Sequence, residues 1–430
     1  MQVHVEGTAG FTEALRATCD RGEADHARVE PVVREILEAV RREGDAAVRR
    51  FDARFGGRAA EVLLRRDYGG AAALARLPAD ARAALEVAAE RIARFHERQR
   101  DAGYRYEEDG VTLGVRVRPV RRAGVYAPGG KARYPSSVLM SAIPARVAGV
   151  GDVIVATPLA GDASDDVLLA AAHLSGVTGV LDSGGAQAIA ALAYGTESVP
   201  RADIVVGPGN AYVACAKRLV FGAVRIDSVA GPSEILVVAD EGADPRVVAA
   251  DLLSQAEHDE AAYPLLVTTS RRLAEETARQ VQAQLATLPR EKIARASVEA
   301  NGRAFVVATR ERMAELADAL AAEHLSLQVA DPEGLLTRIG AAGAAFLGPL
   351  TPEAAGDYVA GPSHVLPTGG SVRFGSPLGV YDFVTRTSLI GYTPSALAAQ
   401  ARSITSLARL EGLEGHARAV EVRVPGQSVG

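Results

Sequence analysis

Short apolar runs alternate with longer amphipathic segments along most of the chain. The runs are rich in Val, Ile and Leu and are bounded by turn residues, which is typical of buried parallel strands. The segments between them have apolar residues at helical spacing. This alternation predicts an α/β fold in which helices cover both faces of parallel sheets. The predicted strands are 111–119, 123–127, 153–156, 179–181, 204–206, 235–239, 265–268, 305–308 and 325–329.

The alternation begins near residue 108 and starts again near residue 236. It therefore predicts two Rossmann-like parallel-sheet modules, 108–235 and 236–370. Residues 1–107 are predicted to be mostly helical. Residues 371–430 are predicted to form a loop-rich stretch followed by a helix over Ser395–Leu410, and a tail of this length can pack on a partner subunit.

The composition is that of an ordinary globular protein with a large core: 430 residues, 48% hydrophobic and 23% charged, with a formal charge of −6. The basic residues are dispersed, which argues against nucleic acid as the main partner. No apolar run is long enough to span a bilayer, and the N-terminus does not resemble a signal peptide. Two cysteines, Cys19 and Cys215, give no disulfide framework and suit a reducing, cytoplasmic compartment.

The stretch 230–260 joins a predicted strand to a predicted helix that begins at Asp244-Pro245. Gln255 and His258 are three residues apart near the end of this helix, so they share one face. An amide oxygen and an imidazole nitrogen together form half of a plausible metal site. The alternative is a plain helix end with a histidine that the helix dipole favours.

Further residues with catalytic or ligating chemistry follow in the second half of the chain. Glu323-His324 lies between a predicted helix and strand and offers two bases. Asp357 and His364 lie in a Gly- and Pro-rich stretch, 356–370, that is predicted to be ordered by turns rather than by helix or strand. Glu411 and His416 lie in the tail. Taken singly, these residues are equally compatible with a surface pair, a connecting loop and a flexible end.

Three glycine-containing turns follow predicted strands, at 126–130, 183–187 and 207–210. Ligands of open α/β sheets bind at the carboxyl ends of strands, and glycine lets a ligand approach the backbone closely. No G-x-G-x-x-G motif is present, so any dinucleotide binding must use a variant scheme. Plain tight turns are the alternative.

Several motifs together resemble those of the histidinol dehydrogenase family. The most specific are IDSVAGPSE at 226–234 and LLSQAEHD at 252–259, which match the family signature without a gap. The stretches YAPGGKARYPSSVLMSAIPARVAGV at 126–150 and GDYVAGPSHVLPTGG at 356–370 match equally well. The resemblance spans nearly the whole chain. Two departures are Ala322, where the family usually has proline, and the polar pair Asp182-Ser183 before a Gly-Gly turn.

The resemblance implies an NAD- and zinc-dependent enzyme that oxidises L-histidinol to L-histidine through histidinal, the last step of histidine biosynthesis. It implies a homodimer with shared active sites. It implies Glu323 and His324 as the acid–base pair, and the following binding residues: for zinc, Gln255, His258, Asp357 and His416; for NAD, Tyr126, Gln187 and Asn210; for the substrate, Ser233, Gln255, His258, His324, Asp357, His364, Glu411 and His416.

Other functions share parts of this residue set. A paralogous zinc- and NAD-dependent dehydrogenase of another small amino- or sulfo-alcohol could use the same catalytic residues. A zinc hydrolase could use Glu323 with a metal-bound water, although the glycine-containing turns speak against it. A non-catalytic metal-binding scaffold would need neither Glu323 nor His324.

Overall fold

A computed structural model describes residues 1–21, 25–129, 133–229 and 231–424. The chain forms two compact units, one made of Met1–Gln99 and Val120–Phe383 and the other of Arg100–Pro119 and Val384–Gly430. Gly130 and Ala230, which belong to turns and motifs named above, lie outside the described residues.

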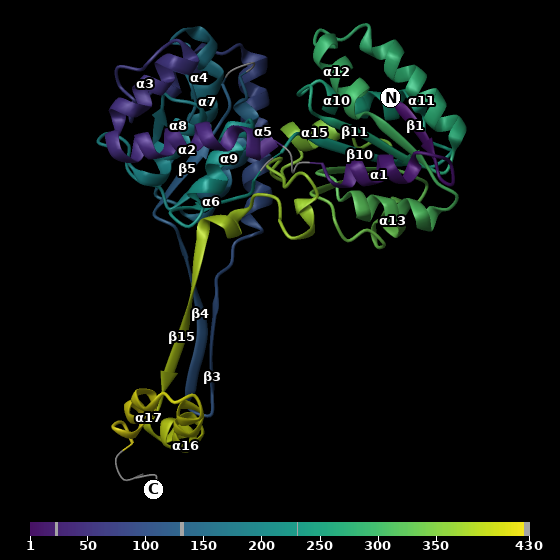
Figure 1. Cartoon of the computed structure of the whole chain (residues 1–430). Coiled ribbons are helices and arrows are strands. Elements are labelled where there is room, and N and C mark those ends of the chain that lie inside the picture. The colour runs from purple at the N-terminus through teal and green to yellow at the C-terminus, as the bar shows by residue number, and fades with distance from the viewer. Residues whose placement is uncertain (22–24, 130–132, 230, 425–430) are drawn as a thin grey trace. The chain divides into compact units, whose positions relative to one another are not determined.

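The first sheet of the larger unit has six strands in the order β2-β7-β6-β5-β8-β9, of which β5 is labelled in Figure 1. All its pairs are parallel except β2 with β7. The strands are β2 (Leu64–Arg65), β5 (Arg122–Tyr126), β6 (Asp152–Ala156), β7 (Gly179–Leu181), β8 (Ile204–Val206) and β9 (Arg225–Ile226).

Both faces of this sheet are covered, as its apolar strands require. Along β6, Ile154 and Ala156 join one buried cluster, whereas Val153 and Val155 join another on the opposite face. The helices on the first face are α2 (Asp25–Glu43), α3 (Asp45–Gly56), α8 (Gly185–Tyr194) and α9 (Ala211–Val220). Those on the second are α5 (Ala79–Glu97), α6 (Pro135–Ala148) and α7 (Asp166–Leu174), with α4 (Gly70–Arg76) beside α7.

The second sheet also has six strands, in the order β1-β12-β11-β10-β13-β14, and all of them are parallel. The strands are β1 (Gln2–Val5), β10 (Glu234–Ala239), β11 (Tyr263–Thr268), β12 (Arg303–Val306), β13 (His324–Gln328) and β14 (Ala344–Leu347). One face packs on α10 (Pro245–Ala256), α11 (Arg271–Leu285) and α12 (Glu291–Asn301). The other packs on α1 (Phe11–Cys19), α13 (Arg310–Leu320) and α14 (Pro332–Leu336).

The smaller unit is an antiparallel sheet with two helices. Its strands follow the order β15-β4-β3 and are β3 (Tyr104–Glu108), β4 (Val111–Pro119) and β15 (Val384–Tyr392). The helices are α16 (Pro394–Leu410) and α17 (Glu414–Glu421). Residues 115–118 of β4 alternate between half-buried and exposed positions, because an antiparallel sheet can leave one face in water.

The predicted fold class is confirmed: two parallel-sheet modules, a helical N-terminal region and a helical C-terminal tail. The predicted helix start at Asp244 is also present, since its side chain accepts a hydrogen bond from the backbone of Arg246 at 2.9 Å. Two local predictions were wrong. The tail contains the nine-residue strand β15 and a second helix, α17, and the stretch 356–370 begins inside helix α15 (Glu353–Tyr358).

Two further properties concern the described residues as a whole. Cys19 and Cys215 are both free thiols. Among the helices that the structure describes, none combines the length and the apolar character that crossing a membrane requires.

A buried polar group lies between α10 and β13. Asp251 Oδ2 accepts hydrogen bonds from Gln328 Nε2 at 2.8 Å and from Ser326 Oγ at 3.4 Å. Despite these donors, burial raises the pKa of Asp251 from 3.8 to about 6. Between those two values the folded chain holds a proton that the unfolded chain releases, so this residue makes the fold less stable as pH rises.

Replacing Asp251 with asparagine should remove this dependence. The unmodified protein should lose about 2 kcal/mol of its free energy of unfolding between pH 4 and pH 7 through Asp251, with allowance for screening by nearby water. Asp251→Asn should not lose this contribution, so its free energy of unfolding relative to the unmodified protein should rise by the same amount. Urea unfolding of both proteins across this range measures the difference. A difference that does not change with pH would contradict the raised pKa.

Candidate active site

The amino ends of β10 and β13 bring the predicted acid–base pair to one edge of the second sheet. Glu234 begins β10 and His324 begins β13, and the two strands pair in parallel with Ile235 opposite His324. Glu323 directly precedes β13. It follows Ala321, which ends α13 in the left-handed conformation with φ 45°. Helix α10 leads back from the far end of β10, so its C-terminal end also lies at this edge.

Hydrogen bonds to Glu234 fix both members of the pair. The backbone N–H of Glu234 donates to Glu323 Oε2 at 2.8 Å, and the backbone N–H of Glu323 donates to Glu234 Oε2 at 3.3 Å. The ring Nδ1 of His324 lies 2.9 Å from the carbonyl oxygen of Glu234. Because a carbonyl oxygen can only accept, Nδ1 carries a proton and Nε2 is the nitrogen free to act as a base.

Two carboxylates from α15 face this free nitrogen. His324 Nε2 lies 3.6 Å from Glu353 Oε1 and 3.9 Å from Asp357 Oδ1. Glu353 and Asp357 are four residues apart on one helical turn, so both point the same way. Ser254 Oγ of α10 donates to the other oxygen of Glu353 at 3.0 Å. Ligand atoms of His324, Glu353 and Asp357 all lie within 4.8 Å of one another, which is close enough to hold one metal ion.

Two of the predicted binding residues lie beside Asp357. His258 Nε2 is 3.9 Å from Asp357 Oδ2, and His364 Nδ1 is 3.5 Å from Asp357 Oδ1. Gln255 is buried at the end of α10. Among the described residues, no hydrogen-bond partner is present for the buried Gln255 Oε1, Glu353 Oε1 and His364 Nε2. Unpaired buried acceptors are costly unless something else satisfies them, so this cluster fits a bound cation.

Burial and mutual charge shift the pKa values in the cluster. Burial raises the pKa of Glu323 to about 8, against the opposing effect of His324. Burial, together with the charge of Asp357, raises the pKa of Glu353 to about 7. Burial also lowers the pKa of His258. These are the shifts that general acids and bases need near neutral pH.

The pKa values of the two remaining groups, His324 and Asp357, are shifted by charged and hydrogen-bonding neighbours in spite of burial. Burial favours neutral His324, but the carboxylates of Glu323, Glu353 and Asp357 raise its pKa above the usual value. Burial likewise favours neutral Asp357, yet the hydrogen bond from His364 and nearby imidazoles hold its pKa well below the usual range. Asp357 is therefore ionised and ready to bind a cation.

Sequence analysis missed Glu353. Its fully buried carboxylate lies 3.6 Å from His324 Nε2. The signal was present as Pro352-Glu353-Ala354-Ala355, since proline followed by an acid and two alanines is a helix start. Continuing that helix by one turn would have placed Glu353 and Asp357 on the same face.

The predicted NAD contacts lie at the carboxyl edge of the first sheet. Tyr126 ends β5, and its hydroxyl accepts a hydrogen bond from the backbone N–H of Gly185 at 3.0 Å. Gln187, in the first turn of α8, donates to Asp52 Oδ1 at 2.8 Å. Asn210 is exposed and caps α9 by accepting hydrogen bonds from two backbone N–H groups. The three residues thus lie at or just after the carboxyl ends of β5, β7 and β8, where a dinucleotide could bind.

Gly207 in this region cannot be replaced without distortion. It has φ +112°, and an added Cβ would lie 2.1 Å from the carbonyl oxygen of Tyr126. The polar departure at Asp182 also has a structural reason. Its carboxylate forms a two-pronged ion pair with Arg58, at 3.0 and 2.6 Å, and accepts a hydrogen bond from the backbone of Leu159.

Comparison with known proteins decides the family. A family model described as histidinol dehydrogenase matches residues 19–424. This chain belongs to the histidinol dehydrogenase family. It is 51% identical over 418 residues to the histidinol dehydrogenase of Syntrophotalea carbinolica, covering 96% of this chain and 97% of that protein. It is 50% identical over 403 residues to that of Lactiplantibacillus plantarum, covering 92% and 93%.

A solved histidinol dehydrogenase has the same fold. The crystal structure from Elizabethkingia anophelis matches with a TM-score of 0.92 at 33% identity, covering 99% of this chain and 98% of that chain. The predicted resemblance to the histidinol dehydrogenase family is therefore confirmed. The matched range includes the first sheet, every strand of the second sheet except β1, and the whole of α17.

The remaining residues that the histidinol dehydrogenase resemblance implicates are distributed over both units. Ser233 is half-buried directly before Glu234, and its carbonyl oxygen accepts a hydrogen bond from the backbone of Tyr263. Glu411 and His416 belong to the smaller unit and are exposed, at the end of α16 and in α17. Their roles as substrate and zinc ligands stay predictions.

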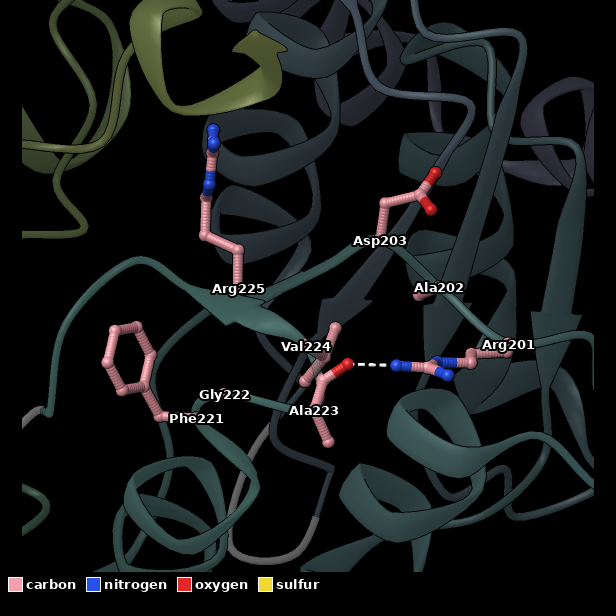
Figure 2. A pocket seen from close by; sticks show the side chains of 8 residues that line it. All are labelled: Arg201, Ala202, Asp203, Phe221, Gly222, Ala223, Val224 and Arg225. Atoms are coloured by element: carbon pink, nitrogen blue, oxygen red, sulfur yellow. Dashed lines mark hydrogen bonds between the residues drawn. The ribbon is translucent and has the colours of Figure 1, made fainter. Parts of the chain in front are cut away.

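A separate pocket of about 330 Å³ lies beside the amino ends of β8 and β9, lined by Arg201–Asp203 and Phe221–Arg225. The Arg201 guanidinium crosses it and donates to the carbonyl oxygen of Ala223 (Figure 2). Tyr126 and Asn210 lie at or just after the carboxyl ends of β5 and β8, which is the edge of the sheet opposite this pocket. This pocket therefore contains no residue of the predicted histidinol dehydrogenase site.

Proposed function

We propose that this protein oxidises L-histidinol to L-histidine through histidinal, with two molecules of NAD as the electron acceptors, as the last step of histidine biosynthesis. The proposal rests on the buried cluster around His324 Nε2 in a chain of the histidinol dehydrogenase family. An alcohol oxidation needs a base of near-neutral pKa beside a group that orients the alcohol.

Zinc would be held by Gln255, His258, Asp357 and His416. The unpaired Gln255 Oε1, the ionised Asp357 and the neighbouring His258 support this set, because zinc accepts nitrogen and oxygen ligands. Bound zinc would supply a Lewis acid that orients and polarises the substrate. Ser233, His364 and Glu411 would make further substrate contacts, together with the zinc-binding residues and His324.

Proton transfers would be divided between the two members of the acid–base pair. His324 Nε2 takes the proton of the substrate hydroxyl in the first oxidation, while the Glu234 carbonyl oxygen holds the proton on Nδ1. Glu323 then takes a proton from water as the bound aldehyde is hydrated. After His324 has released the first proton to solvent, it takes the proton of the hydrate hydroxyl in the final oxidation, as the second hydride passes to NAD. Burial of both residues keeps bulk water from the aldehyde.

The first parallel-sheet module would bind NAD through Tyr126, Gln187 and Asn210. The second, 236–370, would hold the zinc and the catalytic pair. We further propose a cytoplasmic homodimer in which residues 371–430 contact the partner subunit and His416 reaches the partner's site. The exposed apolar side chains of the smaller unit, including Tyr104, Ile390 and Leu410, support such an interface.

The direct test is NAD reduction by the purified protein with L-histidinol. Two NADH should form per L-histidinol consumed, with L-histidine as the product. A zinc chelator should abolish the activity, and added zinc should restore it. Faster turnover of another small amino- or sulfo-alcohol would instead indicate a paralogous dehydrogenase. Hydrolysis without NAD, or zinc binding without any NADH formation, would refute the proposal.

Variants of the catalytic pair test the division of roles. His324→Asn should lose both oxidations by about 100-fold or more, because both need the same base. Glu323→Gln should retain NADH formation from histidinol to histidinal and lose mainly the oxidation of supplied histidinal. Single-turnover measurements with each substrate separate the two steps. Equal loss of both half-reactions in Glu323→Gln would contradict the assignment.

A further inference from the structure

Arg21 forms an ion pair at the base of the site, although it belongs to the N-terminal region and not to the predicted site residues. Its Nε lies 2.8 Å from Glu234 Oε1 and its Nη2 lies 2.7 Å from Glu234 Oε2. Both side chains are only 1% exposed. The two parallel contacts match the fork of a guanidinium to the plane of a carboxylate, so they fix the orientation of Glu234 as well as its charge.

The backbone holds the guanidinium in place from two sides. Arg21 Nη1 donates to the carbonyl oxygen of Thr18 at 2.8 Å, near the end of α1. Its Nη2 also donates to the carbonyl oxygen of Leu320 at 2.7 Å, where α13 ends. Leu320 lies three residues before Glu323 in the chain. Arg21 therefore ties the N-terminal helix to the segment that leads into the catalytic pair.

Glu234 passes this constraint to Glu323 and His324. Its side chain accepts hydrogen bonds from the backbone of Glu323 at 3.3 Å and of Gly369 at 2.7 Å. Its own backbone binds the Glu323 carboxylate through N–H and the His324 ring through the carbonyl oxygen. One residue thus sets the rotamer of Glu323 and the tautomer of His324.

Stability alone does not account for such a pair. A buried ion pair contributes little net stability, because desolvation of the two charges offsets their attraction, and apolar replacements of similar volume are often as stable. What apolar side chains cannot supply is an acceptor for the Glu323 and Gly369 N–H groups. The geometry therefore indicates a role in placing the catalytic pair.

We propose that Arg21 and Glu234 are positioning residues: Arg21 fixes the Glu234 carboxylate, and Glu234 holds Glu323 and the Nδ1-protonated tautomer of His324 in the geometry that proton transfer needs. This inference rests on the proposed oxidation of histidinol. Neither residue is assigned a contact with the substrate.

The test compares Arg21→Met and the double variant Arg21→Met/Glu234→Met with the unmodified protein. Arg122→Met is the control, because Arg122 also pairs with a carboxylate, Asp152, but at the amino end of β5. For each protein, kcat and KM for L-histidinol, zinc content and urea unfolding are measured. The tautomer of His324 is read from ¹⁵N chemical shifts of histidine-labelled protein, with His324→Asn used to assign the signal.

Arg21→Met should lower kcat about 100-fold, since small displacements of catalytic groups have effects of this size. KM should change by less than about threefold, because binding contacts remain. The Nδ1–H tautomer of His324 should give way to a mixture. The double variant should regain stability, as no unpaired charge stays buried, but not kcat. Arg122→Met should unfold more easily with unchanged kcat and tautomer.

A merely structural role would give a different pattern. Normal kcat per folded subunit in Arg21→Met, or recovery of kcat together with stability in the double variant, would overturn the proposal. Absence of histidinol-dependent NADH formation in the unmodified protein and in Arg122→Met would refute the proposed function instead. In that event the tautomer measurement still decides whether Arg21 positions His324, and an unchanged tautomer would overturn the inference.

Discussion

The parallel pairing of β10 with β13 in a single register is the constraint on which the site depends. It puts the backbone of Glu234 against Glu323 and His324, so that one residue donates to a carboxylate and accepts from an imidazole. A shift of one residue would turn every side chain of β13 to the opposite face of the sheet. The apolar clusters on the two faces of the second sheet oppose such a shift, because Leu325 and Leu327 belong to the buried cluster on one face.

Burial gives this edge of the sheet its chemical character. Glu323, Glu353 and Asp357 are three buried carboxylates with His258, His324 and His364 among them. Each carboxylate raises the cost of ionising the next, and each imidazole lowers it. The result is one ionised carboxylate at Asp357 beside two acids with pKa values of about 7 and 8. Such a site can bind a cation and exchange protons at neutral pH.

The sequence was informative where structure is local or where several motifs agree. Strand and helix alternation was enough for the two modules, and Asp244-Pro245 located the start of α10 because capping is a local property. Contacts between distant segments could not be read in this way. Strand β1 joins β12 across some 300 residues of chain, and the pairing of Arg21 with Glu234 depends on that same fold. Glu353 was missed because it begins a six-residue helix whose end falls in the stretch 356–370, which was predicted to be ordered by turns.

We propose that Gln255, His258 and Asp357 hold one zinc ion beside His324, and that His416 of the partner subunit is the fourth ligand. Anomalous diffraction from crystals grown with zinc, recorded at the zinc X-ray absorption edge, tests this proposal. One strong anomalous peak should lie within bonding distance of all four side chains, with His324 and Glu353 outside that distance. A peak bonded instead to His324, Glu353 and Asp357, or no peak at this edge of the sheet, would contradict it.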